Sequence, residues 1–212
     1  MKNSFLFTAL AVVFAICLVV ANVIAGKLWA APFNIILTAG VFCFPIVYII
    51  GDIIPEVYGL KKAQQVIVLG FVANALAVMF FWLTLVAPYP VFWTGQDAFN
   101  VVLGFTPRLL LASFLGYFVG TNVNAWVLVF VKSLTGTKLL WVRTISSTLF
   151  GEGVDSLIFI SVAFYGILPN EALLPMIFYQ ATFKTLYEAA VTPLTYWVVN
   201  YVKKLEGVDQ FA

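Results

Sequence analysis

Six long apolar stretches run through this chain, and each has about the length that a helix needs to cross a lipid bilayer. A hydrocarbon core about 30 Å thick requires about 20 apolar residues at a rise of about 1.5 Å per residue. The sequence therefore predicts an all-α integral membrane protein with six transmembrane helices in a single domain, residues 1–212. We assign the spans to residues 4–25, 35–54, 64–87, 107–131, 144–168 and 173–202.

The composition supports lipid as the solvent of this chain. Hydrophobic residues make up 63% of the 212 residues and charged residues only 9%, whereas soluble domains carry about 25% charged residues. A net charge of +2 gives no sign of a nucleic-acid partner. The chain has no histidine, and Cys17 and Cys43 both lie in apolar runs. We therefore expect neither a metal site, a cofactor nor an enzyme active site.

The basic residues predict the orientation in the membrane. With the N-terminus inside, the cytoplasmic segments hold eight basic residues and the outer segments two, an asymmetry typical of inner-membrane proteins. We therefore expect both termini to be cytoplasmic. The first stretch is too long for the apolar core of a signal peptide, so we expect it to be retained. The inner set is Lys2, Lys61, Lys62, Lys132, Lys138, Arg143, Lys203 and Lys204; the outer set is Lys27 and Arg108.

Two acidic residues stand at the end of the second apolar stretch, in the segment GDIIPEVYGLKK, residues 51–62. If a helix starts near Ile35, Asp52 lies about 26 Å along it, at the cytoplasmic headgroup level. Asp52 and Glu56 then either form a solvated helix end that balances the adjacent lysines or hold a cytoplasmic gate. The predicted gating or coupling residues are Asp52, Glu56, Tyr58 and Arg143.

Deeper polar residues predict a binding site, because ionisable groups inside a membrane are costly and normally mark a pathway. Glu152 and Asp155 are three residues apart and share a helix face, whereas Gln180, Lys184 and Glu188 recur every fourth residue. Lys184 could simply pair with Glu188 or Asp155, but an acid would then stay unpaired. The predicted substrate-binding set is Asn22, Asn74, Arg108, Asn124, Glu152, Asp155, Gln180, Lys184 and Glu188.

A short internal similarity predicts a 3+3 inverted repeat. LVVANVIAG, residues 18–26, resembles YFVGTNVNA, residues 117–125. Three helices followed by three helices would place the two halves in opposite orientations, as in inverted-repeat transporters.

Five parts of the sequence together form a recognisable pattern. They are NVIAGK at 22–27, GDIIPEVYGLKKA at 51–63, GQDAFNVVLGFTPRLLLAS at 95–113, LWVRTISSTLFGEGVDSLIF at 140–159 and the helix with Gln180, Lys184 and Glu188. These stretches resemble the queuosine precursor transporters, a family also grouped as vitamin-uptake transporters. The resemblance covers nearly the whole chain. It implies a six-helix protein of the bacterial inner membrane that imports 7-deazaguanines, namely the 7-cyano or 7-aminomethyl precursor or queuine.

The polar residues suit such a ligand chemically. The parallel N1–H and 2-amino donors of a deazaguanine fit one carboxylate, and the flanking glycines make Glu152 the preferred acceptor. Gln180, Lys184 or an asparagine could serve the O6 acceptor. An alternative function is the substrate-binding membrane subunit of an ATP-driven importer of vitamins or nucleobases. The sequence leaves open which deazapurine is carried, the energy source and whether the chain forms a homo-oligomer.

The basic asymmetry generates a topology prediction. A cysteine placed at Trp93, in a predicted outer loop, should react with a membrane-impermeant thiol reagent added from the periplasmic side. A cysteine at Lys61 should stay protected until the membrane is opened. The reverse labelling pattern would overturn the predicted orientation.

Overall fold

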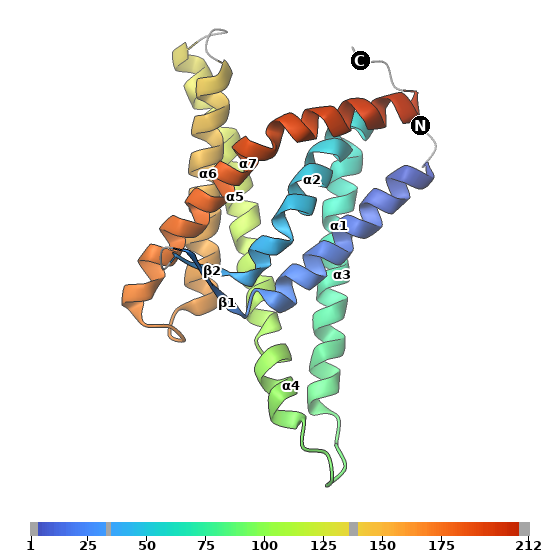
Figure 1. Cartoon of the computed structure of the whole chain (residues 1–212), viewed down its shortest axis with the longest axis vertical. Helices are drawn as coiled ribbons and strands as arrows, with labels where there is room; N and C mark the ends of the chain where they lie inside the picture. The colour runs from blue at the N-terminus through green and yellow to red at the C-terminus, as the bar shows by residue number, and fades with distance from the viewer. Residues whose placement is uncertain (1–3, 33–34, 136–139, 208–212) are drawn as a thin grey trace. The chain divides into compact units, whose positions relative to one another are not determined.

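The computed structural model describes residues 4–32, 35–135 and 140–207. Within them the chain is almost entirely helical, with one short antiparallel hairpin (Figure 1). The elements are α1 (Phe5–Ile24), β1 (Leu28–Ala31), β2 (Ile35–Thr38), the 3-10 helix η2 (Ala39–Phe42), α2 (Phe44–Tyr58), α3 (Leu60–Val86), α4 (Gln96–Leu103), α5 (Thr106–Thr135), α6 (Leu140–Phe164) and α7 (Asn170–Glu206).

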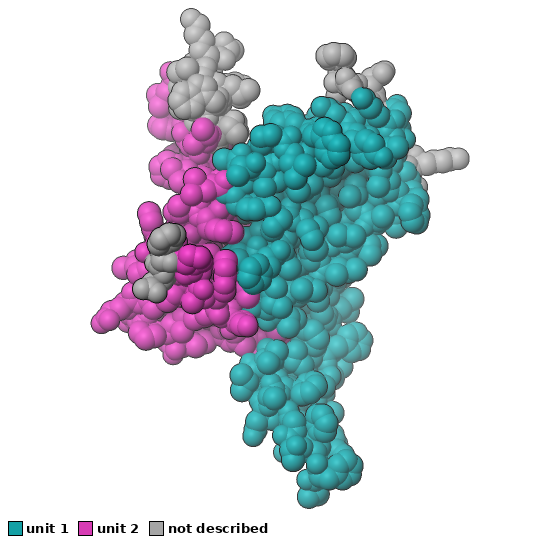
Figure 2. All heavy atoms as spheres, viewed as in Figure 1, with its two compact units in different colours: residues 1–25, 40–104, 187–212 teal, residues 26–39, 105–186 magenta. Residues whose placement is uncertain are grey.

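The chain forms two compact units, coloured separately in Figure 2. Unit 1 contains residues 1–25, 40–104 and 187–212, and unit 2 contains residues 26–39 and 105–186. The boundary does not separate the two halves of the sequence, and α7 contributes to both units. The single domain and the inverted repeat therefore stay predictions.

Helix α2 is the centre of unit 1, because two of its faces are buried against different helices. Ile50 and Ile54 pack with Phe7 and Phe14 of α1 and with Val66 of α3. One residue away around the helix, Ile53 and Val57 pack with Val199 and Val202 of α7. This two-sided packing explains why α2 keeps its helical form through Pro55, which lies inside it. The chain then turns at Gly59, whose φ of 86° favours glycine.

Unit 2 contains α5 and α6, which run side by side (Figure 1). Their contact is made by glycines spaced four residues apart on α5. A methyl group at Gly120 would lie 2.9 Å from the carbonyl oxygen of Gly151 and 2.9 Å from Cβ of Asp155. A side chain therefore does not fit at this position without a shift. Small residues at such spacing let membrane helices approach closely.

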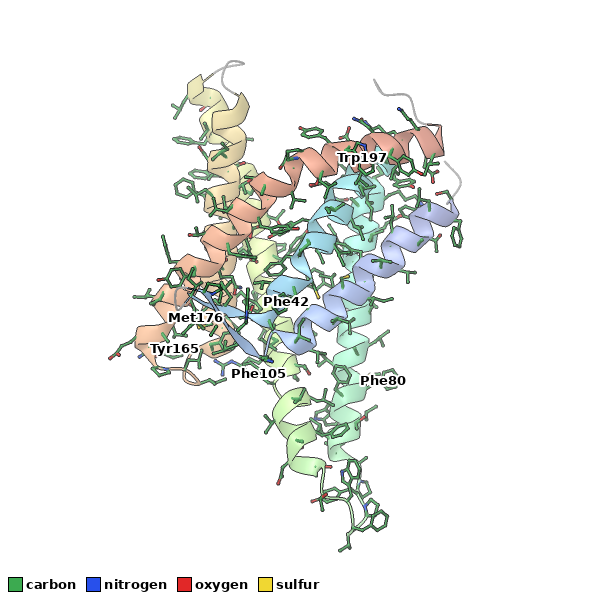
Figure 3. The ribbon with its side chains drawn as sticks, in the orientation of Figure 1. Phe42, Phe80, Phe105, Tyr165, Met176 and Trp197 are labelled. Carbon is green, nitrogen blue, oxygen red and sulfur yellow. The ribbon has the colours of Figure 1, made fainter. Side chains whose placement is uncertain are left out.

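Large apolar side chains cover the outer faces of the long helices. Phe80 projects away from α3 and is 58% exposed (Figure 3). Others include Ile16 on α1, Phe118 on α5 and Phe150 on α6. Four segments of the described chain are long and apolar enough to cross a membrane: Phe5–Ile24, Leu60–Val86, Gln96–Val131 and Ile145–Phe164. They overlap the first, third, fourth and fifth predicted spans, and the total of six spans stays a prediction.

The second predicted span differs from the structure. Residues 35–42, expected to begin a transmembrane helix, form β2 and η2, and the helix starts only at Phe44. Strand β2 pairs with β1 in the register Leu28↔Thr38 to Ala31↔Ile35. Its backbone groups therefore form hydrogen bonds with β1 and not within a helix. Asp52 consequently lies eight residues into α2, roughly 12 Å rather than 26 Å along the helix.

Candidate functional site

Three ionisable side chains meet inside unit 2, and we call Glu152, Asp155 and Lys184 the acid–lysine cluster. Lys184 of α7 donates a hydrogen bond to Oδ2 of Asp155 on α6. Its Nζ also lies 3.2 Å from Oε2 of Glu152, one turn away on the same helix. The side chains are 8%, 19% and 21% exposed for Lys184, Asp155 and Glu152. Of the two partners that the sequence left open for Lys184, the structure shows Asp155, and Glu152 joins this pair.

The amide of Gln180 lies one turn before Lys184 on α7 and is held by the hairpin. Thr38, the last residue of β2, donates its hydroxyl hydrogen to Oε1 of Gln180 over 3.2 Å. Both residues are 1% exposed. Since Oε1 is engaged, the NH2 group of Gln180 is fixed on the other side of the amide. The hydrogen bond from Thr38, which is 142 positions away in the sequence, therefore determines the orientation of the Gln180 amide.

Asp155 is seated against the backbone of α5. A methyl group at Gly116 would lie 2.7 Å from Oδ1 of Asp155, and one at Gly120 would lie 2.9 Å from its Cβ. Asn124 continues this row, since a methyl group at Gly151 would lie 2.7 Å from Cβ of Asn124. The Gly116–Gly120–Asn124 row thus provides the surface on which the acidic stretch of α6 rests.

Two buried polar atoms on α6 have unused hydrogen-bonding capacity. Oε2 of Glu152 accepts no hydrogen bond within the described part of the chain, although it forms the ion pair with Lys184. The hydroxyl of Ser156, four residues later and 0% exposed, likewise has no partner among the described residues. Buried polar groups without partners cost about 1–3 kcal/mol each, so such atoms commonly mark ligand, water or proton sites.

Arg108 was expected in the substrate-binding set, but in the structure its guanidinium group bonds to backbone carbonyl oxygens. Its Nε donates to the carbonyl oxygen of Val162 and its Nη2 to that of Tyr165, both over 2.6 Å. These carbonyls belong to the end of α6, where the last turn of a helix lacks internal donors. A cation at this end also opposes the partial negative charge of the helix dipole. Arg108 therefore caps α6 from the start of α5.

Asn22 and Asn74, both expected in the binding set, belong to unit 1. Asn74 of α3 donates through Nδ2 to the carbonyl oxygen of Leu18 on α1 over 3.3 Å. Leu18 is one turn before Asn22, and both asparagines are buried. These contacts join α1 to α3. The structure therefore does not bring these two asparagines into the acid–lysine cluster, and Glu188, four residues beyond Lys184, also falls in unit 1.

Two of the four predicted gating residues, Glu56 and Tyr58, lie at one end of unit 1. Nζ of Lys203 on α7 pairs with Oε1 of Glu56 on α2 at 2.6 Å. Oε1 of Glu206 accepts hydrogen bonds from the hydroxyl groups of Ser4, over 2.6 Å, and Tyr58, over 3.1 Å. The start of α1, the end of α2 and the end of α7 are thereby tied together. We call this set of contacts the terminal latch.

The other two predicted gating residues are not in the terminal latch. Asp52 is exposed on α2 and makes no ion pair or hydrogen bond within the described residues. The side chain of Arg143 lies outside the described residues.

Sequence reasoning missed Thr38, Ser156, Gly116 and Gly120. The glycines carried a usable signal, since a four-residue spacing of small residues in an apolar helix favours close packing. Ser156 stands beside Asp155, but its burial depends on how α6 rotates. Thr38 gave no signal, because nothing in a short strand predicts a contact with a helix 142 positions later.

Comparison with known sequences identifies the family of this chain. Residues 38–198 match the family described as putative vitamin uptake transporter. The chain belongs to this family. The match runs from Thr38 through the whole acid–lysine cluster, and it confirms the resemblance drawn from the sequence motifs.

Three named relatives are similar to this chain at 27–29% identity. The probable queuosine precursor transporter of Bacillus subtilis is 28% identical over 67% of this chain and 62% of its own length. The queuosine precursor transporter of Escherichia coli is 27% identical over 60% of this chain. The probable queuosine precursor transporter of Haemophilus influenzae is 29% identical over 64%. The matches to the last two span 55% of each relative. No solved structure matches.

The capping geometry of Arg108 generates a stability prediction. Arg108→Gln should lower the free energy of unfolding by about 1–3 kcal/mol, because charge-assisted hydrogen bonds to the end of α6 are lost. Thermal unfolding of the purified protein in detergent measures this. Arg108→Lys keeps the positive charge but cannot make both hydrogen bonds in the same geometry. Its free energy of unfolding should therefore lie between those of the wild-type protein and Arg108→Gln. An Arg108→Gln protein of unchanged stability that no longer binds ligand would return Arg108 to the binding site.

Proposed function

We propose that this chain is a multi-pass protein of the bacterial inner membrane that imports queuosine precursors into the cytoplasm. The candidate ligands are 7-cyano- and 7-aminomethyl-7-deazaguanine and queuine. Support comes from the family and from the names of three relatives. The exposed apolar faces of the long helices fit a lipid environment.

The observation that carries the proposal is the carboxylate of Glu152. It is largely buried, its charge is only partly balanced by Lys184, and its Oε2 accepts no hydrogen bond within the described residues. The N1–H and 2-amino groups of a deazaguanine supply two parallel donors, the arrangement that a carboxylate accepts best. The ring carbonyl O6 lies beside N1, where Gln180 on α7 offers an amide donor. Ser156 provides a further hydroxyl close to Glu152 along α6.

The two units divide the proposed roles. Unit 2 holds the proposed binding residues Glu152, Asp155, Gln180 and Lys184. Unit 1 holds the terminal latch, and we propose that it forms part of a cytoplasmic gate together with Asp52. Support comes from the Glu56–Lys203 ion pair, in which an acid of α2 holds a basic residue of another helix. Breaking this contact would remove one of the polar contacts between the end of α2 and α7, beside the Tyr58–Glu206 hydrogen bond.

The sharpest test of the binding role substitutes Glu152. Glu152→Gln points an amide donor at the ligand's donors and removes a charge-assisted bond, which should cost about 2–4 kcal/mol of binding free energy. Equilibrium binding by the purified protein measures the change. A deazapurine analogue that lacks the 2-amino group and the N1 proton is the control ligand, and its affinity should hardly change. If both ligand types keep wild-type affinity, the accepting carboxylate lies elsewhere, with Glu188 the next candidate.

The gating role predicts a separation of transport from binding. Asp52→Asn should slow uptake into vesicles strongly while changing the equilibrium dissociation constant by less than about tenfold, or 1.4 kcal/mol. Asp97→Asn is the matched control, since Asp97 is also an exposed acid of unit 1. It should leave both quantities unchanged. Loss of binding by a folded Asp52→Asn protein would place Asp52 in the ligand site instead.

Transport by the purified chain alone tests the larger claim. Vesicles that contain only this protein should accumulate a labelled 7-deazaguanine above the level of empty vesicles. Binding without transport would favour a binding subunit that needs an ATP-driven partner. Absence of both would exclude the proposed function.

A further inference from the structure

The charges of the acid–lysine cluster do not balance. Glu152 and Asp155 contribute two negative charges, and Lys184 contributes one positive charge. All three side chains are largely buried in unit 2 of a chain whose outer surface is apolar. The ligand-free cluster therefore carries a net negative charge in a region of low dielectric.

Binding of the guanine-like edge leaves this excess unchanged. The N1–H and 2-amino groups are neutral donors, so they satisfy Oε2 of Glu152 without cancelling its charge. Lys184 cannot compensate fully, because its ammonium already donates to Asp155. A buried excess charge is costly unless a counter-charge lies nearby. A ligand that brings one positive charge of its own therefore completes the cluster.

We infer that this site selects among 7-deazaguanines by charge and prefers a ligand with a cationic 7-substituent, such as an aminomethyl group, over a neutral one. The inference rests on the proposed function and adds the substrate class to it. The preference arises from the charge count of Glu152, Asp155 and Lys184. A neutral 7-cyano ligand keeps the same ring contacts but leaves the negative charge uncompensated.

The test compares two probes that share one ring system, 7-aminomethyl-7-deazaguanine and 7-cyano-7-deazaguanine. The measured quantity is the ratio of their dissociation constants for the full-length purified protein at low salt. Contacts common to both probes cancel in this ratio, so it reports the charge of the site. Two unit charges roughly 10 Å apart at an effective dielectric of about 20 change the ratio by about tenfold.

Three variants set the charge of the site. Asp155→Asn removes one negative charge while keeping an oxygen that accepts from Lys184, and it should lower the preference for the cationic probe by about tenfold. Lys184→Met adds net negative charge and should raise the preference. Glu171→Gln removes an exposed acid in the first turn of α7 and should leave the ratio unchanged. High salt should weaken the effect of Asp155→Asn only slightly, because buried charges are screened less than exposed ones.

The outcomes separate the two proposals. If the protein binds both probes equally, or if Asp155→Asn leaves the ratio unchanged, the charge selection is wrong while the proposed function stands. If neither probe binds the wild-type protein, the proposed function fails and the inference fails with it. Should Lys184→Met not fold, Asp155→Asn against Glu171→Gln still decides, because each removes one carboxylate charge and only one of them lies in the cluster.

Discussion

The burial of Lys184 between two carboxylates is the constraint on which unit 2 depends. A lysine ammonium that is 8% exposed is strongly destabilising unless acids stand beside it. Glu152 and Asp155 fulfil this need only when α6 presents them toward α7, since both occupy one face of α6. The rotation of α6 is thereby fixed by charge, in a setting where the hydrophobic effect cannot fix it. In lipid an apolar face gains nothing by turning inward, so polar and close-packing contacts decide the arrangement.

The helices of unit 1 are held together mainly by apolar packing. Its helices α1, α2 and α3 pack through aliphatic and aromatic side chains, and α2 lies between two clusters. Polar contacts are concentrated at the end where the Glu56–Lys203 pair and the Glu206 hydrogen bonds occur. Ser4 serves twice there, because its hydroxyl oxygen also accepts from the backbone N–H of Phe7 and caps α1. The Ser4 side chain therefore both caps the start of α1 and connects α1 to the end of α7 through Glu206.

The sequence predicted the long apolar helices well because bilayer thickness sets a length that an apolar run must reach. The predicted spans at 4–25 and 64–87 lie within a few residues of α1 and α3. The span at 35–54 was wrong at its start, since Ile35, Ile36 and Leu37 suit a strand as readily as a helix. Its partner strand was not recognisable beforehand. The turn between α2 and α3 falls at Gly59, whose positive φ is one that glycine adopts readily.

The candidate site was only partly predictable for a related reason. Spacing along one helix shows which residues share a face, and this put Glu152 with Asp155 and Gln180 with Lys184. Contacts between elements far apart in sequence depend on the rotation and sliding of whole helices. The Thr38–Gln180 hydrogen bond and the capping of α6 by Arg108 are of this kind. Arg108 looked like a ligand-binding cation because its partners are backbone carbonyls, which leave no trace in the side-chain pattern.

The cap made by Arg108 has a mechanical consequence for unit 2. Arg108 fastens the end of α6 to the start of α5, and the close fit of Asp155 at Gly116 and Gly120 fastens the two helices again about two turns further along α5. Two attachments at different heights prevent both sliding and rolling of one helix on the other. Helices α5 and α6 should thus behave as a single stiff body, with the acids embedded in it. The lysine and the amide lie on α7, so the acid–lysine cluster is a polar contact that connects α7 to this stiff body.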